Sequence, residues 1–321
     1  MSPLDKKFLF VVGKGGVGKT TVSAALALAA AKMGKRVLVA QCNAKDRMGH
    51  MLSVEPIGPH IRNVAPDLDA VNMEPQAALE EYGLLVLKVR ALYKLVFENR
   101  FVAAFLRGTP GLEAWAMLGK AQHHALEQTH GRDAYDLVIV DAPATGHGLD
   151  LLRVPKVIIQ VAPPGLLRRE AEQAWNLFSD STRAGVVLVT LPEEMPTNET
   201  LELHATLRDE LQLPIAGLVI NGRSQTLFTA EDEKLLATLR DTLSSESSLY
   251  PLAHCSWVRS DVEALERACE ERLAEEIAAP MVSLARLSTL DVRLPEIETL
   301  ATELKNGFAT LSNGTRSPRT R

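Results

Sequence analysis

Short apolar runs alternate with amphipathic stretches through much of the chain, and this rhythm predicts strands separated by helices. Thr21 to Met33 is rich in alanine and predicts the first helix, and Asn198 to Leu211 predicts a later one. Strands that alternate with helices pair in parallel, so we expect an α/β protein with a mostly parallel sheet between helices. The apolar runs that predict the strands are Phe8 to Val12, Arg36 to Cys42, Tyr135 to Asp141, Val186 to Thr190 and Ile215 to Asn221.

The stretch 74–130 departs from this rhythm and predicts a subdomain that is almost wholly helical, with a break near Gly108 to Gly111. Between Gly83 and Leu106 the apolar residues cover more of a helix than one core-facing stripe needs. A neighbouring helix is the first candidate for covering that surface. A client segment or a second subunit is the next, and the basic residues of this stretch also allow peripheral contact with an anionic membrane.

The rest of the chain completes the predicted organisation. Residues 1–73 and 131–308 are expected to form one core around the helical insertion, and 309–321 to be a disordered tail. Val262 to Phe308 is predicted to be mainly helical. A stripe of apolar residues there has an acidic rather than a basic polar side, so we expect it to pack in the core and not on a membrane: Ile297, Leu300, Leu304, Phe308 and Leu311.

Composition narrows the classes of function. A chain of 321 residues, 46% hydrophobic and 23% charged, is long enough to bury a large core. A net charge of −5 gives no general attraction for nucleic acid, and none is expected as a partner. The three cysteines form no C-x-x-C pair, so no zinc is expected, and they fit a reducing compartment. With no leader-like or membrane-spanning stretch in the sequence, we expect a cytoplasmic protein.

The first predicted strand leads directly into a glycine-rich loop of the form G-x-x-x-x-G-K-[ST], from Gly13 to Thr20. Glycines let backbone N–H groups point at a phosphate, and the N-terminus of the following helix favours the same negative charge. Lys19 is expected to bind the β- and γ-phosphates, and Thr20 to offer a hydroxyl to Mg²⁺. The expected nucleotide-binding residues of the loop are Gly13, Gly15, Gly16, Val17, Gly18, Lys19, Thr20 and Thr21.

A second lysine, Lys14, stands in the loop where the pattern does not require one. With it the loop reads GKGGVGKT and resembles that of the signature-lysine ATPases, in which this deviant Walker A lysine reaches the nucleotide bound by the partner subunit. The resemblance therefore implies a dimer that closes on ATP and Mg²⁺. Physically, such a lysine places positive charge against the charge of the transition state only when two subunits meet.

A further motif follows the strand that ends at Asp141, an acid placed to hold Mg²⁺ opposite Thr20. The run from Asp141 to His147 and the leucine-rich stretch behind it resemble the second switch of the arsenite-pump and tail-anchored-protein-targeting ATPases. Gly146 would let this loop rearrange when the γ-phosphate is lost. His147 is better interpreted as a structural hydrogen-bonding residue than as a catalytic base.

The first switch departs from the pattern of these ATPases. Their strand ends in Asp-Pro-Ala-His, whose aspartate orients the attacking water, whereas the corresponding residues here run from Asn43 to Asp46. An amide cannot accept a proton as a carboxylate does, although it can hold a water. Asp46 is a candidate substitute if the loop folds back. Slow hydrolysis and ordinary hydrolysis therefore both remain open.

The nucleotide base has two candidate neighbours. Asn221 closes a strand and, by the same resemblance, would hydrogen-bond the adenine, while a turn residue is the simpler interpretation. Pro251 matches the proline of the loop that lines the base in those ATPases, although the sequence after it diverges.

Taken together, the patterns predict an ATP-binding, Mg²⁺-dependent ATPase that works as a homodimer or with a related subunit. Nucleotide binding and hydrolysis would rearrange the helical, apolar surface to hold or release a client. The alternative is a regulatory paralogue, impaired in hydrolysis, that pairs with an active ATPase. A subunit for metalloid transport is less favoured, because the chain has no cysteine between Cys42 and Cys255.

Overall fold

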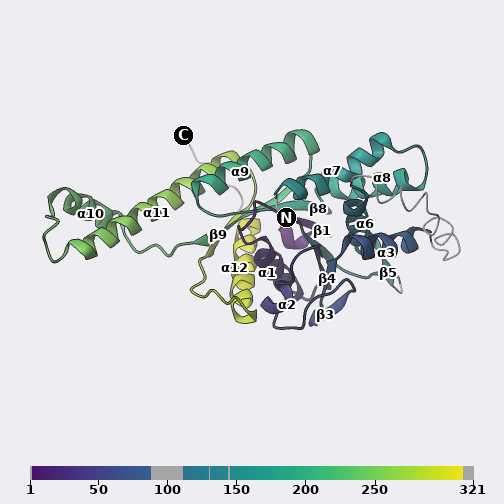
Figure 1. Ribbon diagram of the computed structural model, residues 1–321, viewed down its shortest axis with the longest axis horizontal. Helices are drawn as coiled ribbons and strands as arrows, with labels where there is room; N and C mark the ends of the chain where they lie inside the picture. The colour runs from purple at the N-terminus through teal and green to yellow at the C-terminus, as the bar shows by residue number, and fades with distance from the viewer. Residues whose placement is uncertain (1, 88–110, 130, 144, 314–321) are drawn as a thin grey trace.

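The computed structural model describes residues 2–87, 111–129, 131–143 and 145–313. An eight-stranded sheet forms its centre, with helices on both faces (Figure 1). All neighbouring strands of this sheet run parallel except the edge pair β3–β4. In spatial order the strands are β10 (Met281–Ala285), β9 (Ile215–Arg223), β8 (Ala184–Thr190), β1 (Phe8–Val12), β7 (Leu137–Asp141), β2 (Val37–Cys42), β4 (Leu68–Met73) and β3 (Arg62–Ala65).

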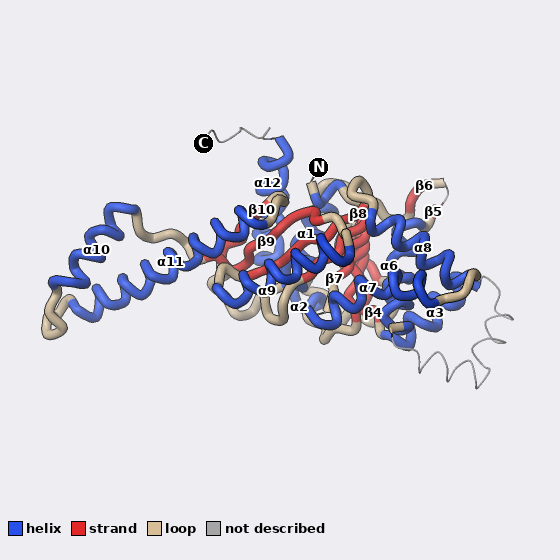
Figure 2. The backbone as a smooth tube through the Cα atoms, turned by 90° about the horizontal axis from the view of Figure 1, so that it is seen from above, coloured by secondary structure: helices blue, strands red, loops and turns tan. Residues whose placement is uncertain are grey.

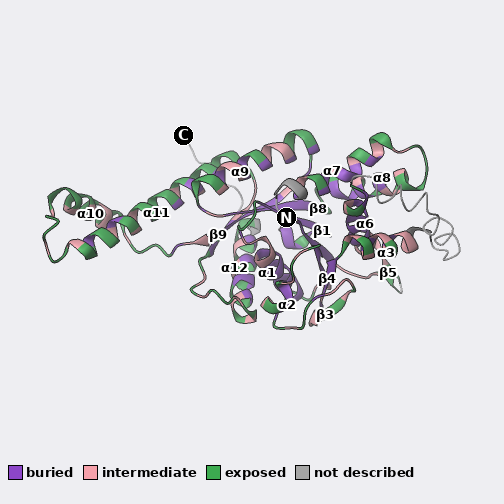
Figure 3. Ribbon diagram, viewed as in Figure 1, coloured by how far each residue is buried: buried purple, intermediate pink, exposed green. Residues whose placement is uncertain are grey.

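The central strands are buried (Figure 3). Their alternate residues enter two separate cores, as expected for a sheet covered on both faces. Leu9 and Val11 face the helices α1 (Lys19–Ala31) and α12 (Leu294–Asn313), which pack on each other. Phe8 and Phe10 face the opposite way and contact the ring of Phe178. The helices of that second face are α6 (Leu112–Leu126), α7 (Thr145–Val161), α8 (Leu166–Ser179) and α9 (Glu194–Ala205), the last continued by the π-helical turn Thr206–Leu211.

Most predicted elements are confirmed, with a few additions. Four residues of the C-terminal stripe, from Ile297 to Phe308, are buried against the core, whereas Leu311 is exposed. The strand β10 differs from the prediction, which makes 262–308 mainly helical. The pair β3–β4 was not predicted. Small elements complete the fold: the 3₁₀ turn Pro3–Asp5, α2 (Met48–Met51), and the paired strands β5 (Gln128–Thr129) and β6 (Arg132–Asp133).

The predicted helical stretch 74–130 contributes α3 (Pro75–Leu87) and α6, which pack together at one end of the molecule. Tyr82 of α3 meets Trp115 of α6 edge to face, with ring centroids 5.9 Å apart. The long helices α7 and α8 join them there. The prediction of an apolar helical surface falls mostly on 88–110, outside the described residues.

A helical hairpin projects from the opposite end of the sheet and was not predicted (Figure 2). It consists of α10 (Ala230–Thr242) and α11 (Tyr250–Glu276). Trp257 of α11 packs against Tyr250 and donates to the backbone carbonyl of Leu236, 2.9 Å away. The bond to Leu236 joins α11 to α10, whereas the ring contact lies within α11.

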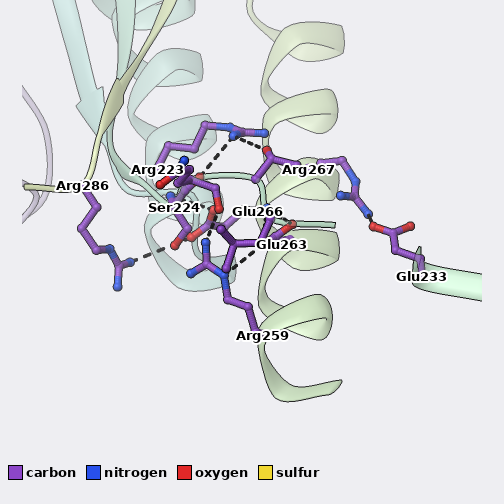
Figure 4. A network of polar contacts seen from close by, with 11 residues as sticks. Arg223, Ser224, Glu233, Arg259, Glu263, Glu266, Arg267 and Arg286 are labelled. Atoms are coloured by element: carbon purple, nitrogen blue, oxygen red, sulfur yellow. Dashed lines mark hydrogen bonds and ion pairs between the residues drawn. The ribbon is translucent and has the colours of Figure 1, made fainter. Parts of the chain in front are cut away.

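Two buried carboxylates attach the hairpin to the loop that follows β9 (Figure 4). Glu263 accepts hydrogen bonds from the amide of Leu227 at 3.1 Å and from Arg259 at 2.9 Å. Glu266 accepts from the amide of Ser224 at 3.0 Å. A buried carboxylate is costly unless hydrogen-bond donors surround it. These bonds therefore hold α11 in one orientation relative to the loop after β9.

Candidate functional site

The carboxyl ends of β1, β2, β7 and β9 meet at one edge of the sheet, which is where parallel α/β folds bind ligands. The glycine-rich loop connects β1 to α1 at this edge. Gly16 and Gly18 have φ angles of 87° and 91°, in the left-handed region that glycine adopts without steric cost. The chain therefore needs these glycines to turn its backbone amides around a phosphate.

Two close approaches hold this loop in place. A Cβ on Gly13 would lie 2.2 Å from the carbonyl oxygen of Val189, and a Cβ on Gly18 would lie 2.2 Å from Nδ2 of Asn221. Asn221 Nδ2 also donates to the carbonyl of Val17 at 2.9 Å. The predicted base-binding asparagine is thus brought to the loop, where it supports the backbone; its bond to adenine stays a prediction.

Thr20 and Asp141 meet beneath the loop, as the prediction of a shared Mg²⁺ site requires. The Thr20 hydroxyl donates to Asp141 Oδ2 at 2.7 Å, and Ser23 donates to Oδ1 at 3.1 Å. Asp141 is almost fully buried, and burial raises its pKa, opposed by the two hydroxyl donors and by the charge of Lys19. A hydroxyl and a carboxylate are ligands that suit Mg²⁺, so these residues fit the ion.

Lys19 lies along the loop with Nζ 2.9 Å from the carbonyl oxygen of Lys14. Burial lowers its pKa, with Asp141 acting in the opposite direction. An ammonium held by a backbone carbonyl can turn to a phosphate at low cost. Lys14 itself points elsewhere, toward Glu199 of α9, with which it forms an ion pair.

The loop after β2 contains no carboxylate placed for catalysis in the described arrangement. Cys42 is buried, and burial raises the pKa of its thiol. Asn43 is exposed and has a φ angle of 48°. The carboxylate of Asp46 accepts from the amides of Gly49 at 3.0 Å and Ile57 at 2.7 Å, so it closes its own loop.

The remaining predicted residues lie far from the phosphate loop or are only partly described by the structure. Gly146 and His147 belong to the first turn of α7, and the side chain of His147 lies outside the described part of the structure. Pro251 is in the first turn of α11, which begins at the end of the hairpin far from the sheet (Figure 1). The structure does not bring it to the phosphate loop, because 250–276 form one long helix where a base-lining loop was expected.

Two residues of the site were missed from the sequence. Ser23 follows Thr20 by three positions on α1 and so lies on the same helix face, a spacing that could have revealed its bond to Asp141. Glu199 lies 185 residues from Lys14, and no local pattern indicates that the two meet.

The parallel sheet, the glycine-rich loop at its carboxyl edge and the Thr20–Asp141 contact define a P-loop nucleotide-binding protein. Comparison with known proteins narrows this class. Residues 6–162 match the family model described as anion-transporting ATPase. By this match and by its relatives, the chain is similar to the arsenite-pump P-loop ATPases.

The relatives share fewer than a third of the aligned residues with this chain. ATPase BagA of Mycobacterium tuberculosis is 28% identical over 224 residues, which cover 66% of this chain and 63% of that protein. An arsenical pump-driving ATPase of Escherichia coli is 30% identical over 232 residues, covering 67% of this chain and 39% of the relative. A putative arsenical pump-driving ATPase of Halobacterium salinarum is 28% identical, covering 68% and 35%. The chain thus spans less than two thirds of the length of these relatives.

Proposed function

We propose that this chain is an ATP-binding dimeric switch that hydrolyses ATP with Mg²⁺ and uses the change to rearrange a helical, apolar surface for a client or partner. The contact of Thr20 with the buried carboxylate of Asp141 beside the phosphate loop carries this proposal. When bound, Mg²⁺ would neutralise phosphate charge between these two residues. Lys19 would leave the Lys14 carbonyl for the β- and γ-phosphates.

The course of the chain supports a coupling between this site and the helices. Asp141 ends β7, and α7 begins at Thr145 and packs against both α6 and α8. A displacement of the short connection would therefore be passed directly to the helical end of the molecule.

The described part of that helical end also carries exposed apolar residues. Val157 and Val161 of α7 are 50% and 74% exposed, and Leu166 and Leu167 of α8 are about two fifths exposed, at 39% and 42%. They lie around the α7–α8 connection. A cluster of exposed apolar side chains suits a surface that binds a client or partner.

Lys14 provides the test of the dimer. We expect the purified chain to shift from monomer to dimer mass in sedimentation velocity when Mg²⁺ and a non-hydrolysable ATP analogue are added. Lys14→Ala should weaken this dimer and lower ATP turnover by at least about tenfold, since a charge supplied across an interface is worth more than that in related sites. Lys305→Ala, an exposed lysine on α12, is the matched control and should change neither value. A chain that stays monomeric with the analogue, or equal behaviour of Lys14→Ala and the control, would count against the proposal.

The end of β2 favours a second candidate, a regulatory subunit with impaired hydrolysis. The thiol of Cys42 is buried, Asn43 carries an amide, and the carboxylate of Asp46 accepts from amides of its own loop, an arrangement that favours slow hydrolysis.

For this second candidate, we expect Asn43→Asp to raise ATP turnover by about 100-fold or more, the lower end of the range for a positioned general base. Turnover is measured under saturating ATP and Mg²⁺, with thermal unfolding as the control for folding. If the parent chain is already fast and the substitution leaves its rate unchanged, the impaired-switch candidate is rejected.

A further inference from the structure

Lys14 has a partner within its own chain. Its ammonium forms an ion pair with Glu199, whose side chain is only 22% exposed, against 47% for that of Lys14. Glu199 lies on α9, which follows the strand next to β1 in the sheet. The lysine expected to act on a second copy is therefore directed toward its own α9.

The position of Glu199 is fixed from two sides. Its neighbours Thr197 and Thr200 are on the buried face of α9, which packs on the core. Asn198 accepts a 2.5 Å hydrogen bond from Arg272 of α11. Because α9 is held by both, the carboxylate of Glu199 is presented to the loop at a defined place.

The opposite side of the ion pair is equally well defined. The carbonyl oxygen of Lys14 accepts from Lys19 at 2.9 Å, and a Cβ on Gly13 would lie only 2.2 Å from the backbone of β8. The backbone that carries Lys14 is thus held close to β8, the strand that precedes α9. Only the Lys14 side chain has to turn for its ammonium to change partner.

We propose that Glu199 is a positioning residue that restrains Lys14 until a second, ATP-bound copy of the chain offers phosphate oxygens in its place. This inference rests on the proposed dimeric switch. A carboxylate and a triphosphate compete for one ammonium, so closing the dimer requires the ion pair to break in each copy. Without nucleotide there is no competitor, and the restraint keeps Lys14 on α9.

The expected size of the effect follows from exposure. Ion pairs at the protein surface shift an equilibrium by about fivefold or less, because water and salt screen them. A symmetric dimer breaks two of them. Removing the charge of Glu199 should therefore tighten ATP-dependent dimerisation by about 2- to 20-fold, and high salt should reduce the difference.

The test compares dimer dissociation constants, measured by sedimentation with Mg²⁺ and the non-hydrolysable ATP analogue. Glu199→Gln should tighten the dimer, Glu199→Asp should restore the restraint at least in part, and Glu202→Gln, an exposed residue of the same helix, should change nothing. In a Lys14→Ala background, Glu199→Gln should have no effect, because the residue acts through Lys14.

The outcomes separate this inference from the proposal beneath it. If Lys14→Ala leaves the dimer of the parent chain unchanged, the role of Lys14 across the interface fails, and the restraint fails with it. If Lys14→Ala weakens the dimer but Glu199→Gln leaves it unchanged or weakens it, the restraint alone is overturned. An equal effect of Glu199→Gln with and without Lys14 also overturns it, since a purely structural role would give that result.

Discussion

Asp141→Asn is expected to lower Mg²⁺-dependent ATP turnover by about 100-fold or more while making the nucleotide-free chain more stable. The loss follows because a metal ion supplies several kcal/mol of charge stabilisation, and each 1.36 kcal/mol is a factor of ten in rate. The gain in stability follows because Asp141 is 4% exposed and its charge is buried at a cost that an amide does not have.

The raised pKa of Asp141 determines how the free energy of unfolding changes with pH. Burial raises the pKa of Asp141 in the folded chain, so the folded state binds the proton more tightly than the unfolded state does. The free energy of unfolding therefore falls as pH rises from the ordinary range of an aspartate through the folded pKa. Asp141→Asn should remove this contribution, which thermal unfolding of the nucleotide-free chain across pH 4 to 8 would measure.

Asp136→Asn is the matched control, in the residue just before the other end of β7. Asp136 is bound by Arg36 at 2.8 Å, and this partner lowers its pKa. Its stabilising contribution is present above its unfolded pKa and is lost as pH falls through the folded pKa. Asp136→Asn should therefore lower stability slightly and leave turnover unchanged. If Asp141→Asn lowers stability and spares turnover in the same way, Asp141 is a structural acid and not part of a metal site.

Gly18→Ala should weaken ATP binding by at least about tenfold and lower the free energy of unfolding by about 2 to 4 kcal/mol. A side chain at φ 91° costs about 1–2 kcal/mol, and the new Cβ would also lie 2.2 Å from Asn221 Nδ2. The strained backbone and the displaced amide add to each other. Calorimetric titration with ATP and chemical unfolding measure the two effects.

Gly34→Ala isolates the backbone cost in this second prediction. Gly34 has a φ angle of 81°, close to that of Gly18, but a Cβ there meets no atom within 4 Å. We expect it to lose about 1–2 kcal/mol of stability and no affinity for ATP. Adding Asn221→Ala to Gly18→Ala should recover part of the stability. Equal losses in Gly18→Ala and Gly34→Ala would show that the contact with Asn221 carries no weight.

The sequence predicts the centre of this fold well because its signals there are local. The apolar runs at β1, β2, β7, β8 and β9 have the length of buried strands, and the spacing of the loop glycines has a direct steric reason. Thr20 and Asp141 could be paired in advance, since parallel strands bring their carboxyl ends to one edge.

What the sequence could not predict depends on packing between distant segments. The residues after Tyr250 contain a proline that suits a loop, yet Pro251 stands in a first helical turn, where proline is tolerated as well. The projecting hairpin is fixed by Glu263 and Glu266, whose amide donors lie about 40 residues earlier in the chain. The role of Asp46 could not be predicted for the same reason. Only the folded loop shows that the amides of Gly49 and Ile57 donate to its carboxylate.

Titration of the chain with ATP, with and without Mg²⁺, tests the central claim most directly. We predict one ATP bound per chain, with an affinity that Mg²⁺ increases in the parent protein and does not increase in Asp141→Asn. Absence of ATP binding, or an equal effect of Mg²⁺ in both proteins, would contradict the assignment of this edge of the sheet as a magnesium–nucleotide site.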